Sequence, residues 1–481
     1  MTYKDNSTVE ADRYVFLGFL LALFWIPLPV ASNHPWAWSF FEVCVFALAI
    51  TWLMLFAMGR VKTTPAFRRA WLALLLFAMI FVWVIFQLAP LPLSLIALLS
   101  PNAAEVYSHT QTDAALSLDP SGTRAAALKT LAYGVLFALT LLLTNRRGRL
   151  RTLALVLLFS GVFQAAFGAL MTLSGLEYGF FAEKVHHKGF VTGTFVNPNH
   201  LAGYLEMCLA IGVGLMLADM STTPATNWRE SARRLLNTIL GDKARVRVAL
   251  IIMVIGLVLS KSRMGNIAFF TSLLVAGGYY VLVVRRVSVG IIAFFVSVLL
   301  IDILIIGNVF GIEKVAEEIR QTSVTTEALR IDVARDTLEI VRDYPLTGTG
   351  AGSFASTYLM YDSGKVGSNY YKYAHNDYLH FAAEFGLPGL AMLATIVSLS
   401  LWQAARAQLE RHDRTMRGLG CGVLMAIVAL LIHTAVDFNL QIPANAATFV
   451  VILAMGWQTR WRGHHARARH LSTAAPAKAK A

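Results

Sequence analysis

The sequence predicts an all-α polytopic membrane protein with about twelve transmembrane helices. Hydrophobic residues make up 57% of its 481 residues and charged residues only 14%, and the mean hydropathy is +0.59. Soluble globular proteins carry about 25% charged residues. Apolar runs of about 17 or more residues recur along almost the whole chain, and each is long enough to cross roughly 30 Å of hydrocarbon. These runs exclude a soluble enzyme with a single anchor.

The apolar runs define the spans in order. We expect them at about 14–31, 37–58, 71–89, 126–144, 152–174, 201–219, 248–260, 266–284, 288–308, 387–404, 419–436 and 443–458. The first run could be taken for a cleaved signal because Ala31 follows a short apolar stretch. Its leader, however, carries three acidic residues against two basic ones, whereas a signal leader is normally basic. We therefore expect a retained span.

The positive charge gives the expected orientation. The net charge is +13, which in a soluble domain would suggest nucleic acid, but here the Lys and Arg residues lie in short links between apolar runs. With the N-terminus inside, 28 of the 41 basic residues fall in the inner links and at the two ends. Because cytoplasmic loops are enriched in Lys and Arg, both termini are expected to be cytoplasmic.

The chain divides into four parts on this basis. Residues 1–308 form spans 1–9, residues 309–386 form one large outer loop, residues 387–458 form spans 10–12, and residues 459–481 form a basic tail. The tail is rich in Ala, Lys and Pro from Ser472 onward and is expected to be disordered. Cys44, Cys208 and Cys421 lie in separate apolar runs, so neither a disulfide framework nor a thiolate metal site is indicated and packing is their expected role.

Three outer segments are longer than turns, at about 100–125, 175–200 and 309–386. Long connections of this kind are usually functional or disordered, and the third does not have a disordered composition. In it, Ile331, Ala334, Leu338 and Val341 recur at helical spacing, and Asp-Tyr-Pro at 343–345 ends the pattern. The spacing predicts a helix within the loop.

His375 is a candidate for proton transfer. It lies near the end of the third outer segment, in Tyr-Ala-His-Asn-Asp-Tyr-Leu at 373–379. Asn376 is a good N-cap, so residues 377–385 are expected to form a short helix that ends at Gly386-Leu-Pro. The positive end of this helix dipole disfavours imidazolium and attracts anions, which favours a neutral, proton-accepting ring. From these residues alone, a surface histidine that only helps to cap the helix is equally favoured.

Two arginines are candidates for binding an anion. Arg263 lies in Leu-Ser-Lys-Ser-Arg-Met-Gly at 259–265, between two apolar runs, where Lys261 adds a second cation. Two cations on a short outer turn oppose the inside bias and indicate either function or snorkelling. Arg330 begins the predicted loop helix, and from these residues alone a solvated helix charge is favoured over a functional role.

Other polar residues give weaker signals. The glycine run at 348–352 lacks the Lys and Ser/Thr of a Walker motif, so a plain turn is favoured over a phosphate loop. His186, His187 and His200 have no carboxylate at ligand spacing, and a metal site is not favoured. Asp437 is an isolated acid at an outer end, expected to be structural or to position an arginine. The outer segments contain no D-x-D or E-x-D, which metal-dependent sugar transfer would use.

The chain resembles the O-antigen ligase and Wzy polymerase superfamily of bacterial membrane glycosyltransferases. The strongest match combines Tyr-Pro-Leu-Thr-Gly-Thr-Gly at 344–350, His-Asn-Asp-Tyr-Leu at 375–379 and Glu-Phe-Gly-Leu-Pro-Gly-Leu at 384–390, with ten residues between His375 and Gly386. Weaker matches are Gly-Thr-Phe at 193–195 with Asn-Pro-Asn at 197–199, and Ser-Arg-x-Gly at 262–265. The resemblance covers most of the chain, including the number of spans and the position of the large loop.

The resemblance implies a GT-C-like fold and transfer of a glycan en bloc from undecaprenyl pyrophosphate to an acceptor hydroxyl at the periplasmic face of the inner membrane. It implies inversion at the anomeric carbon, with no metal, no cofactor and no nucleic acid. His375 would assist the acceptor hydroxyl, and Arg263 and Arg330 would stabilise the leaving pyrophosphate. The residues implied to bind substrate are Asn376, Tyr378, Lys261, Asn199 and His200.

The resemblance leaves the acceptor open. A polymerase uses a second lipid-linked repeat unit, and the product is O-antigen, capsule or exopolysaccharide, with a flippase and a chain-length regulator as further partners. A ligase uses lipid A-core. We favour the polymerase because the Tyr-rich stretch 358–373 and the Gly-Thr-Phe-x-Asn-Pro-Asn stretch are more typical of exopolysaccharide-type members. A protein O-oligosaccharyltransferase is less favoured. A transporter is least favoured. It would have polar residues along a midplane pathway, whereas the conspicuous polar residues of this sequence cluster at the outer face.

Overall fold

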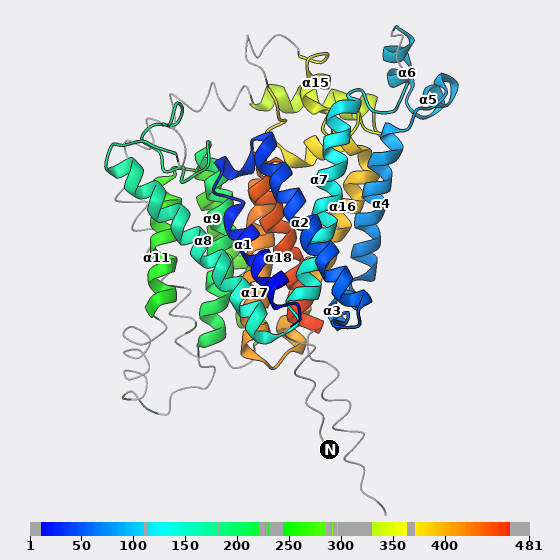
Figure 1. Ribbon diagram of the computed structural model, residues 1–481. Coiled ribbons are helices and arrows are strands. Elements are labelled where there is room, and N and C mark those ends of the chain that lie inside the picture. The colour runs from blue at the N-terminus through cyan, green and yellow to red at the C-terminus, as the bar shows by residue number, and fades with distance from the viewer. Residues whose placement is uncertain are drawn as a thin grey trace, which may run out of the picture.

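The described part of the chain is helical. The computed structural model describes residues 11–109, 114–179, 183–220, 244–284, 330–362 and 371–461, together with residues 227, 229, 291 and 296. In these ranges the only extended pairing is one isolated bridge between Tyr178 and Glu183. The long helices run side by side in a bundle, and shorter helices cover one end of it (Figure 1). The described residues therefore form an all-α polytopic membrane fold.

The helices of the first half of the chain alternate long spans with short outer and inner pieces. They are α1 (Arg13–Trp25), η1 (Val30–Ser32), α2 (Pro35–Ala57), α3 (Pro65–Arg69), α4 (Trp71–Leu88), α5 (Leu93–Leu99), α6 (Pro101–Ser108), α7 (Pro120–Leu143), α8 (Arg147–Leu173) and α9 (Pro198–Asp219). The second half contains α11 (Ala244–Leu259), α12 (Arg263–Val283), α15 (Phe354–Tyr358), α16 (Asp377–Glu410), α17 (Arg414–His433), η2 (Asn439–Gln441) and α18 (Pro443–Trp461).

The observed helices agree with most of the expected spans. In the described residues, 8 helices are long and apolar enough to cross a membrane, namely α2, α4, α7, α8, α9, α12, α16 and α17. The shorter or more polar helices α1, α11 and α18 coincide with three further expected spans. The expected span at 288–308 lies almost wholly outside the described residues. The total of twelve therefore stays a prediction.

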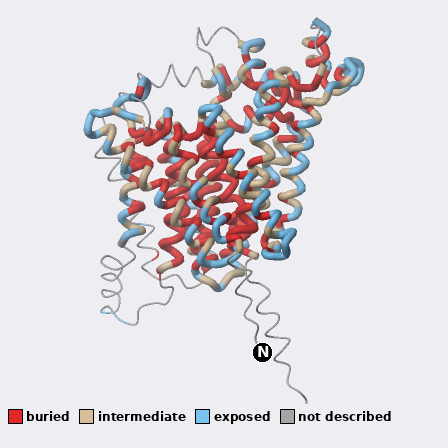
Figure 2. The backbone as a smooth tube through the Cα atoms, viewed as in Figure 1, coloured by how far each residue is buried: buried red, intermediate tan, exposed pale blue. Residues whose placement is uncertain are grey.

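α9 and α17 form the centre of the bundle. The apolar segment of α9 is completely buried, and most of the apolar segment of α17 is buried too. Many residues of α2 and α4 are exposed (Figure 2), and large apolar side chains are among them. The two central backbones approach closely at Gly214 of α9 and at Gly418 and Gly422 of α17, where an added Cβ would touch the opposite backbone. Small residues permit such close packing of membrane helices. This close contact fixes which faces of the two helices meet.

Ion pairs tie the helices together at the end of the bundle opposite the outer loops. Arg149 of α8 pairs with Asp12 at 2.6 Å, Arg151 of α8 with Asp219 of α9 at 2.6 Å, and Arg460 of α18 with Glu410 of α16 at 2.8 Å. These arginines belong to the links and the C-terminal region that the charge distribution assigns to the inner side.

A layer of short helices covers the outer end of the bundle. Residues 330–343 are helical and stop before Pro345, as predicted. Ile331 and Leu338 of the predicted apolar face are exposed, however, while Val333 and Ile340 are buried. Val333 and Ile340 are buried because they pack in one apolar cluster with residues of α5, α6, α15 and α16. The position of these neighbouring helices therefore determines which face of the helix is buried. The helices α5 and α6 were not anticipated from the sequence.

The glycine run forms a turn that packs against a break in α16. Gly386 has φ 69° and ψ 173°, which divides α16 into a short helix over 377–385 and a longer one, as predicted. A Cβ on Gly386 would collide with the backbone of Leu346 and Gly348. Gln87 of α4 fastens this contact, donating to the carbonyl oxygens of Thr347 at 2.7 Å and of residue 384 at 2.9 Å. The turn thus holds the start of α16, and with it residue 375, in place.

Candidate active site

The segment around His375 is held against the connection between α17 and α18. Asn376 accepts a hydrogen bond from the Leu379 N–H at 3.0 Å, which makes it the N-cap of α16, and its amide donates to the Ala435 carbonyl at 2.9 Å. The buried Asp377 carboxylate accepts from the Leu440 N–H at 2.9 Å and from the Gln441 amide at 3.2 Å. These bonds bring residues 434–441 beside His375, although about sixty residues separate them in sequence.

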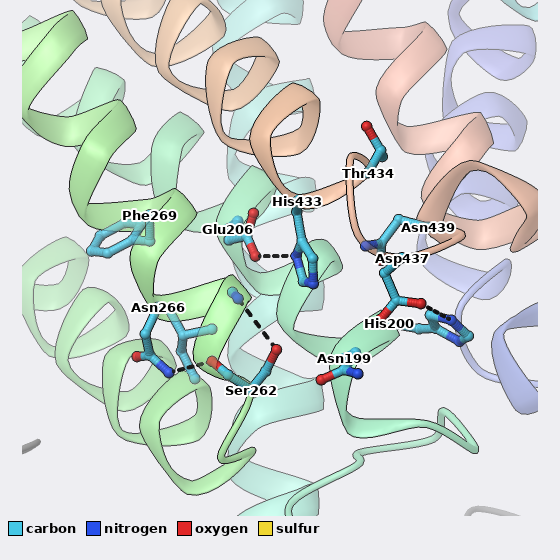
Figure 3. Close-up of polar contacts among 12 residues, drawn as sticks. Asn199, His200, Glu206, Ser262, Asn266, Phe269, His433, Thr434, Asp437 and Asn439 are labelled. Carbon is cyan, nitrogen blue, oxygen red and sulfur yellow. Dashed lines mark hydrogen bonds and ion pairs between the residues drawn. The ribbon is translucent and has the colours of Figure 1, made fainter. Parts of the chain in front are cut away.

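Asp437 lies between two imidazoles as a result. Its Oδ1 is 3.7 Å from His200 Nε2 (Figure 3). The same oxygen is 3.8 Å from His375 Nδ1. The Asp437 side chain is 2% exposed, that of His200 7% and that of His375 18%. His375 is therefore the most accessible member of the cluster and the one best placed to meet a substrate, with the carboxylate behind it.

His375 has an unusual backbone conformation. Its φ is +52°, in the left-handed region that only a few per cent of non-Gly residues adopt, most often Asn, Asp and His. Residues held in such conformations cost of order 1–3 kcal/mol and cluster at functional sites. The surrounding hydrogen bonds from Asn376 and Asp377 fix this conformation, which orients the imidazole toward Asp437.

The charges of the site favour a neutral imidazole on His375 and an ionised Asp437. Burial lowers the pKa of His375 to about 4, with Arg330 and His200 acting in the same direction and Asp437 opposing them. Burial would raise the pKa of Asp437, but His200, His433 and Arg330 outweigh it and hold that pKa well below the usual range. Arg330 is close to the cluster, since its Nη1 lies 3.5 Å from the Val436 carbonyl.

Aromatic rings enclose the imidazoles. The ring of Phe438 meets His375 edge-on at a centroid distance of 4.7 Å and His200 at 4.4 Å, and Tyr373 stacks on its other side at 4.4 Å. Tyr371 approaches His375 at 5.9 Å. This apolar wall removes water from one side of His375, which is the physical origin of its lowered pKa.

The two other predicted cations lie at the outer end of α12. Ser262 caps this helix by accepting from the Gly265 N–H at 3.2 Å, and Arg263 is its first residue, with an exposed side chain. Lys261, at φ +56°, places its ammonium 4.7 Å from the centroid of Phe190. An added Cβ on Gly265, two residues after Arg263, would lie 2.6 Å from the Ala202 Cβ near the start of α9, so these cations lie at the same end of the bundle as His200 and His375.

The remaining residues predicted to bind substrate differ in their exposure and in their hydrogen bonds. Asn199 lies in the first turn of α9, partly exposed, and faces the same region as Ser262 and Asp437 in Figure 3. The Tyr378 hydroxyl donates to the Leu431 carbonyl at 2.7 Å, and the Asn376 amide is engaged as described. Their assignment to substrate binding, like that of His200 and Lys261, stays a prediction.

Sequence reasoning placed too little weight on Asp437 and missed Glu206 and His433. Glu206 of α9 and His433 of α17 form a buried pair, with Oε1 and Nδ1 2.7 Å apart. A signal was present, because ionisable residues inside expected spans usually mark a functional region. Within the ranges that the structure describes, no group of three or more His, Cys, Asp or Glu residues is arranged to hold a metal ion.

Comparison with known proteins finds one matching family. Residues 248–394, which include Arg263, Arg330 and His375, match the family model of O-antigen ligase. No curated protein matches the chain significantly. The family match supports assignment to the O-antigen ligase and Wzy polymerase superfamily. That family implies a membrane enzyme of the glycosyltransferase type, and it fits lipid-linked glycans as substrates.

Proposed function

We propose that this chain, as a member of the O-antigen ligase and Wzy polymerase superfamily, transfers a glycan en bloc from undecaprenyl pyrophosphate to a sugar hydroxyl at the periplasmic face of the bacterial inner membrane. The observation that carries the proposal is the Asp437 carboxylate 3.8 Å behind the partly exposed His375, with three cations at the same end of the bundle. A base, a charge behind it and cations for a leaving group are the parts that such a displacement needs.

The reaction follows from these parts. The acceptor oxygen bonds to the anomeric carbon while the bond from that carbon to the phosphate oxygen breaks, and its electrons leave with the pyrophosphate. His375 takes the hydroxyl proton, and the carboxylate of Asp437 stabilises the imidazolium that forms. Attack opposite the leaving group inverts the anomeric configuration. No metal takes part in this scheme.

Arg263 and Arg330 act on the leaving group. The pyrophosphate gains negative charge as it departs, and a guanidinium binds two phosphate oxygens at once through its planar fork. Arg330 already lies beside Asp437, and Arg263 stands at the positive end of α12. A fixed positive charge at this place supplies the stabilisation that a divalent ion provides in metal-dependent transferases.

For the acceptor, we favour a second lipid-linked repeat unit, which makes the protein a Wzy-type polymerase of O-antigen, capsule or exopolysaccharide. The support is the Tyr-rich stretch 358–373, part of which lies outside the described residues, and the Gly-Thr-Phe-x-Asn-Pro-Asn stretch before α9. O-antigen ligase is the second candidate, because the matching family model carries that description.

The test is to incubate the purified protein with one lipid-linked repeat unit and to separate the products by size. A ladder without added acceptor supports the polymerase. A single product that requires lipid A-core supports the ligase. If glycan is transferred in neither reaction, the proposed function is wrong.

A matched pair of variants tests the role of His375. Asn tolerates the left-handed backbone, so His375→Asn should keep the wild-type thermal stability and bind the donor, while single-turnover transfer falls by about 10²- to 10⁴-fold. His109→Asn makes the same change at an exposed histidine at the end of α6 and should leave transfer unchanged. Equal activity of the two variants would exclude His375 as the base.

A further inference from the structure

The short helix α5 (Leu93–Leu99) takes no part in the candidate active site. Together with α6 it projects from the bundle beside the outer end of α4 (Figure 1). Its seven residues are Leu, Ile and Ala with a single serine. Leu93, Leu95 and Leu98 are exposed, and Leu98 is 79% exposed. Exposed apolar surface that is contiguous in this way marks a site of contact with a protein or a membrane.

This apolar surface continues the lipid-facing surface of α4. The large exposed side chains of α4 recur every three or four residues, which places them on one face of the helix. They are Trp71, Leu75, Met79, Val82 and Ile85. Because α4 is long and apolar enough to cross a membrane, this face is expected to meet acyl chains. α4 ends at Leu88 and α5 begins at Leu93, so the two apolar surfaces are nearly continuous along the chain.

The link between the two helices suits a place at the edge of the hydrocarbon. Lipid cannot satisfy a free backbone N–H, and the link leaves none free. Pro90 and Pro92 have no N–H, the Ala89 N–H donates within the last turn of α4, and the Leu91 N–H donates to the Ala114 carbonyl at 3.0 Å. The chain can therefore turn here without exposing an unpaired donor to lipid.

Charged residues are absent from this part of the sequence. None lies between Arg69 and Glu105, as expected for a segment in contact with hydrocarbon, where charge is costly. The next helix, α6, differs, because its exposed residues include Glu105 and Ser108. The two adjacent helices thus present surfaces suited to different solvents. This contrast indicates that the boundary between lipid and water falls between α5 and α6.

The opposite face of α5 packs against the outer layer of helices. Ile96 is buried in the apolar cluster that also contains Val333 of the helix at 330–343. α6 adds a polar contact to the end of the same helix, since the Asn102 amide donates to the Asp343 carbonyl at 3.1 Å. α5 therefore joins the outer layer on one side and exposes leucines on the other.

We propose that α5 is an interfacial helix that lies in the outer leaflet of the bilayer and anchors the helix at 330–343 to the membrane surface. Leu93, Leu95 and Leu98 enter the boundary between headgroups and acyl chains, as the apolar faces of interfacial helices do. The partner is the lipid surface itself and not a particular headgroup, because α5 carries no charged side chain. The inference is independent of the proposed glycan transfer.

Spin labels in proteoliposomes test this location. In a Cys44→Ala protein, whose other native cysteines are buried, Leu98→Cys carries a nitroxide. Its collisions with oxygen, which dissolves in lipid, are compared with its collisions with a neutral, water-soluble nickel chelate. Val82→Cys on α4 and Ser108→Cys on α6 are the matched controls, since both side chains are exposed. We expect oxygen to dominate at Leu98 and Val82, and nickel to dominate at Ser108.

Two other patterns would overturn the proposal. If nickel dominates at Leu98 as it does at Ser108, α5 lies in water. If both reagents are excluded from Leu98, a protein covers α5, either a second copy of this chain or a different partner. Leu95→Cys repeats the comparison at a second exposed position of the helix.

A polar variant tests whether the leucines hold α5 in the lipid. Leu93→Gln combined with Leu95→Gln should lower the ratio of oxygen to nickel collisions at Leu98 by about twofold or more, because less apolar surface enters the interface. The ratio at Val82 should not change. Since both leucines are exposed, thermal stability in detergent should match that of the parent protein. An unchanged ratio at Leu98 would show that these leucines do not anchor the helix.

Discussion

Removing the charge of Asp437 tests whether the carboxylate behind His375 contributes to catalysis. The change is Asp437→Asn, which keeps the size of the side chain. Oδ1 lies 3.8 Å from His375 Nδ1, and two unit charges at about this separation interact by about 4 kcal/mol at an effective dielectric constant of about 20. Arg330 opposes part of this attraction. We therefore expect single-turnover transfer to fall by about 10²- to 10³-fold, while donor affinity is retained.

The pH dependence of the same variant supplies an independent check. The pKa of His375 is lowered to about 4 in the wild type, and Asp437 is the neighbour that acts to raise it. Asp437→Asn should therefore lower this pKa further, so that the acidic limb of the transfer profile moves to lower pH. Full activity, or a limb that moves toward neutral pH, would refute this account of the pair.

The remaining predictions concern stability, topology, the leaving group and metal. Gly386→Ala should lower the free energy of unfolding by about 1–3 kcal/mol or more, because its backbone region is essentially restricted to Gly. The control Gly278→Ala, in open space on α12, should raise it by about 0.5–1 kcal/mol; thermal unfolding in detergent compares them, and equal losses would be evidence against a special role for Gly386. In a variant without native cysteines, Met58→Cys and Met360→Cys should be labelled from opposite sides of the membrane by an impermeant maleimide; same-side labelling contradicts the topology. Arg263→Ala should weaken both donor affinity and transfer, and Arg263→Lys should restore only part, since an ammonium lacks the planar fork. Transfer should survive EDTA, and a complete loss that magnesium restores would contradict the arginine-based mechanism.

Local sequence signals were sufficient for the elements of the fold. Hydropathy located the helices, because the lipid acts on each apolar run independently of the others. The cap at Asn376 and the break at Gly386 were likewise predictable, since each depends on the backbone of a few adjacent residues. The same locality made His375 a candidate before any contact was known.

Tertiary structure alone decided how the site is assembled. Asp437 meets His200 and His375, and Glu206 meets His433, across separations of 62 to 237 residues. No periodicity encodes these contacts, because they depend on which helix faces pack together at small residues such as Gly214 and Gly418. The helix at 330–343 is a second example. Its buried face is determined by packing against α5, α6, α15 and α16, and not by the spacing of its apolar residues. Hydropathy thus determines which segments enter the membrane, while packing determines which of their polar side chains meet.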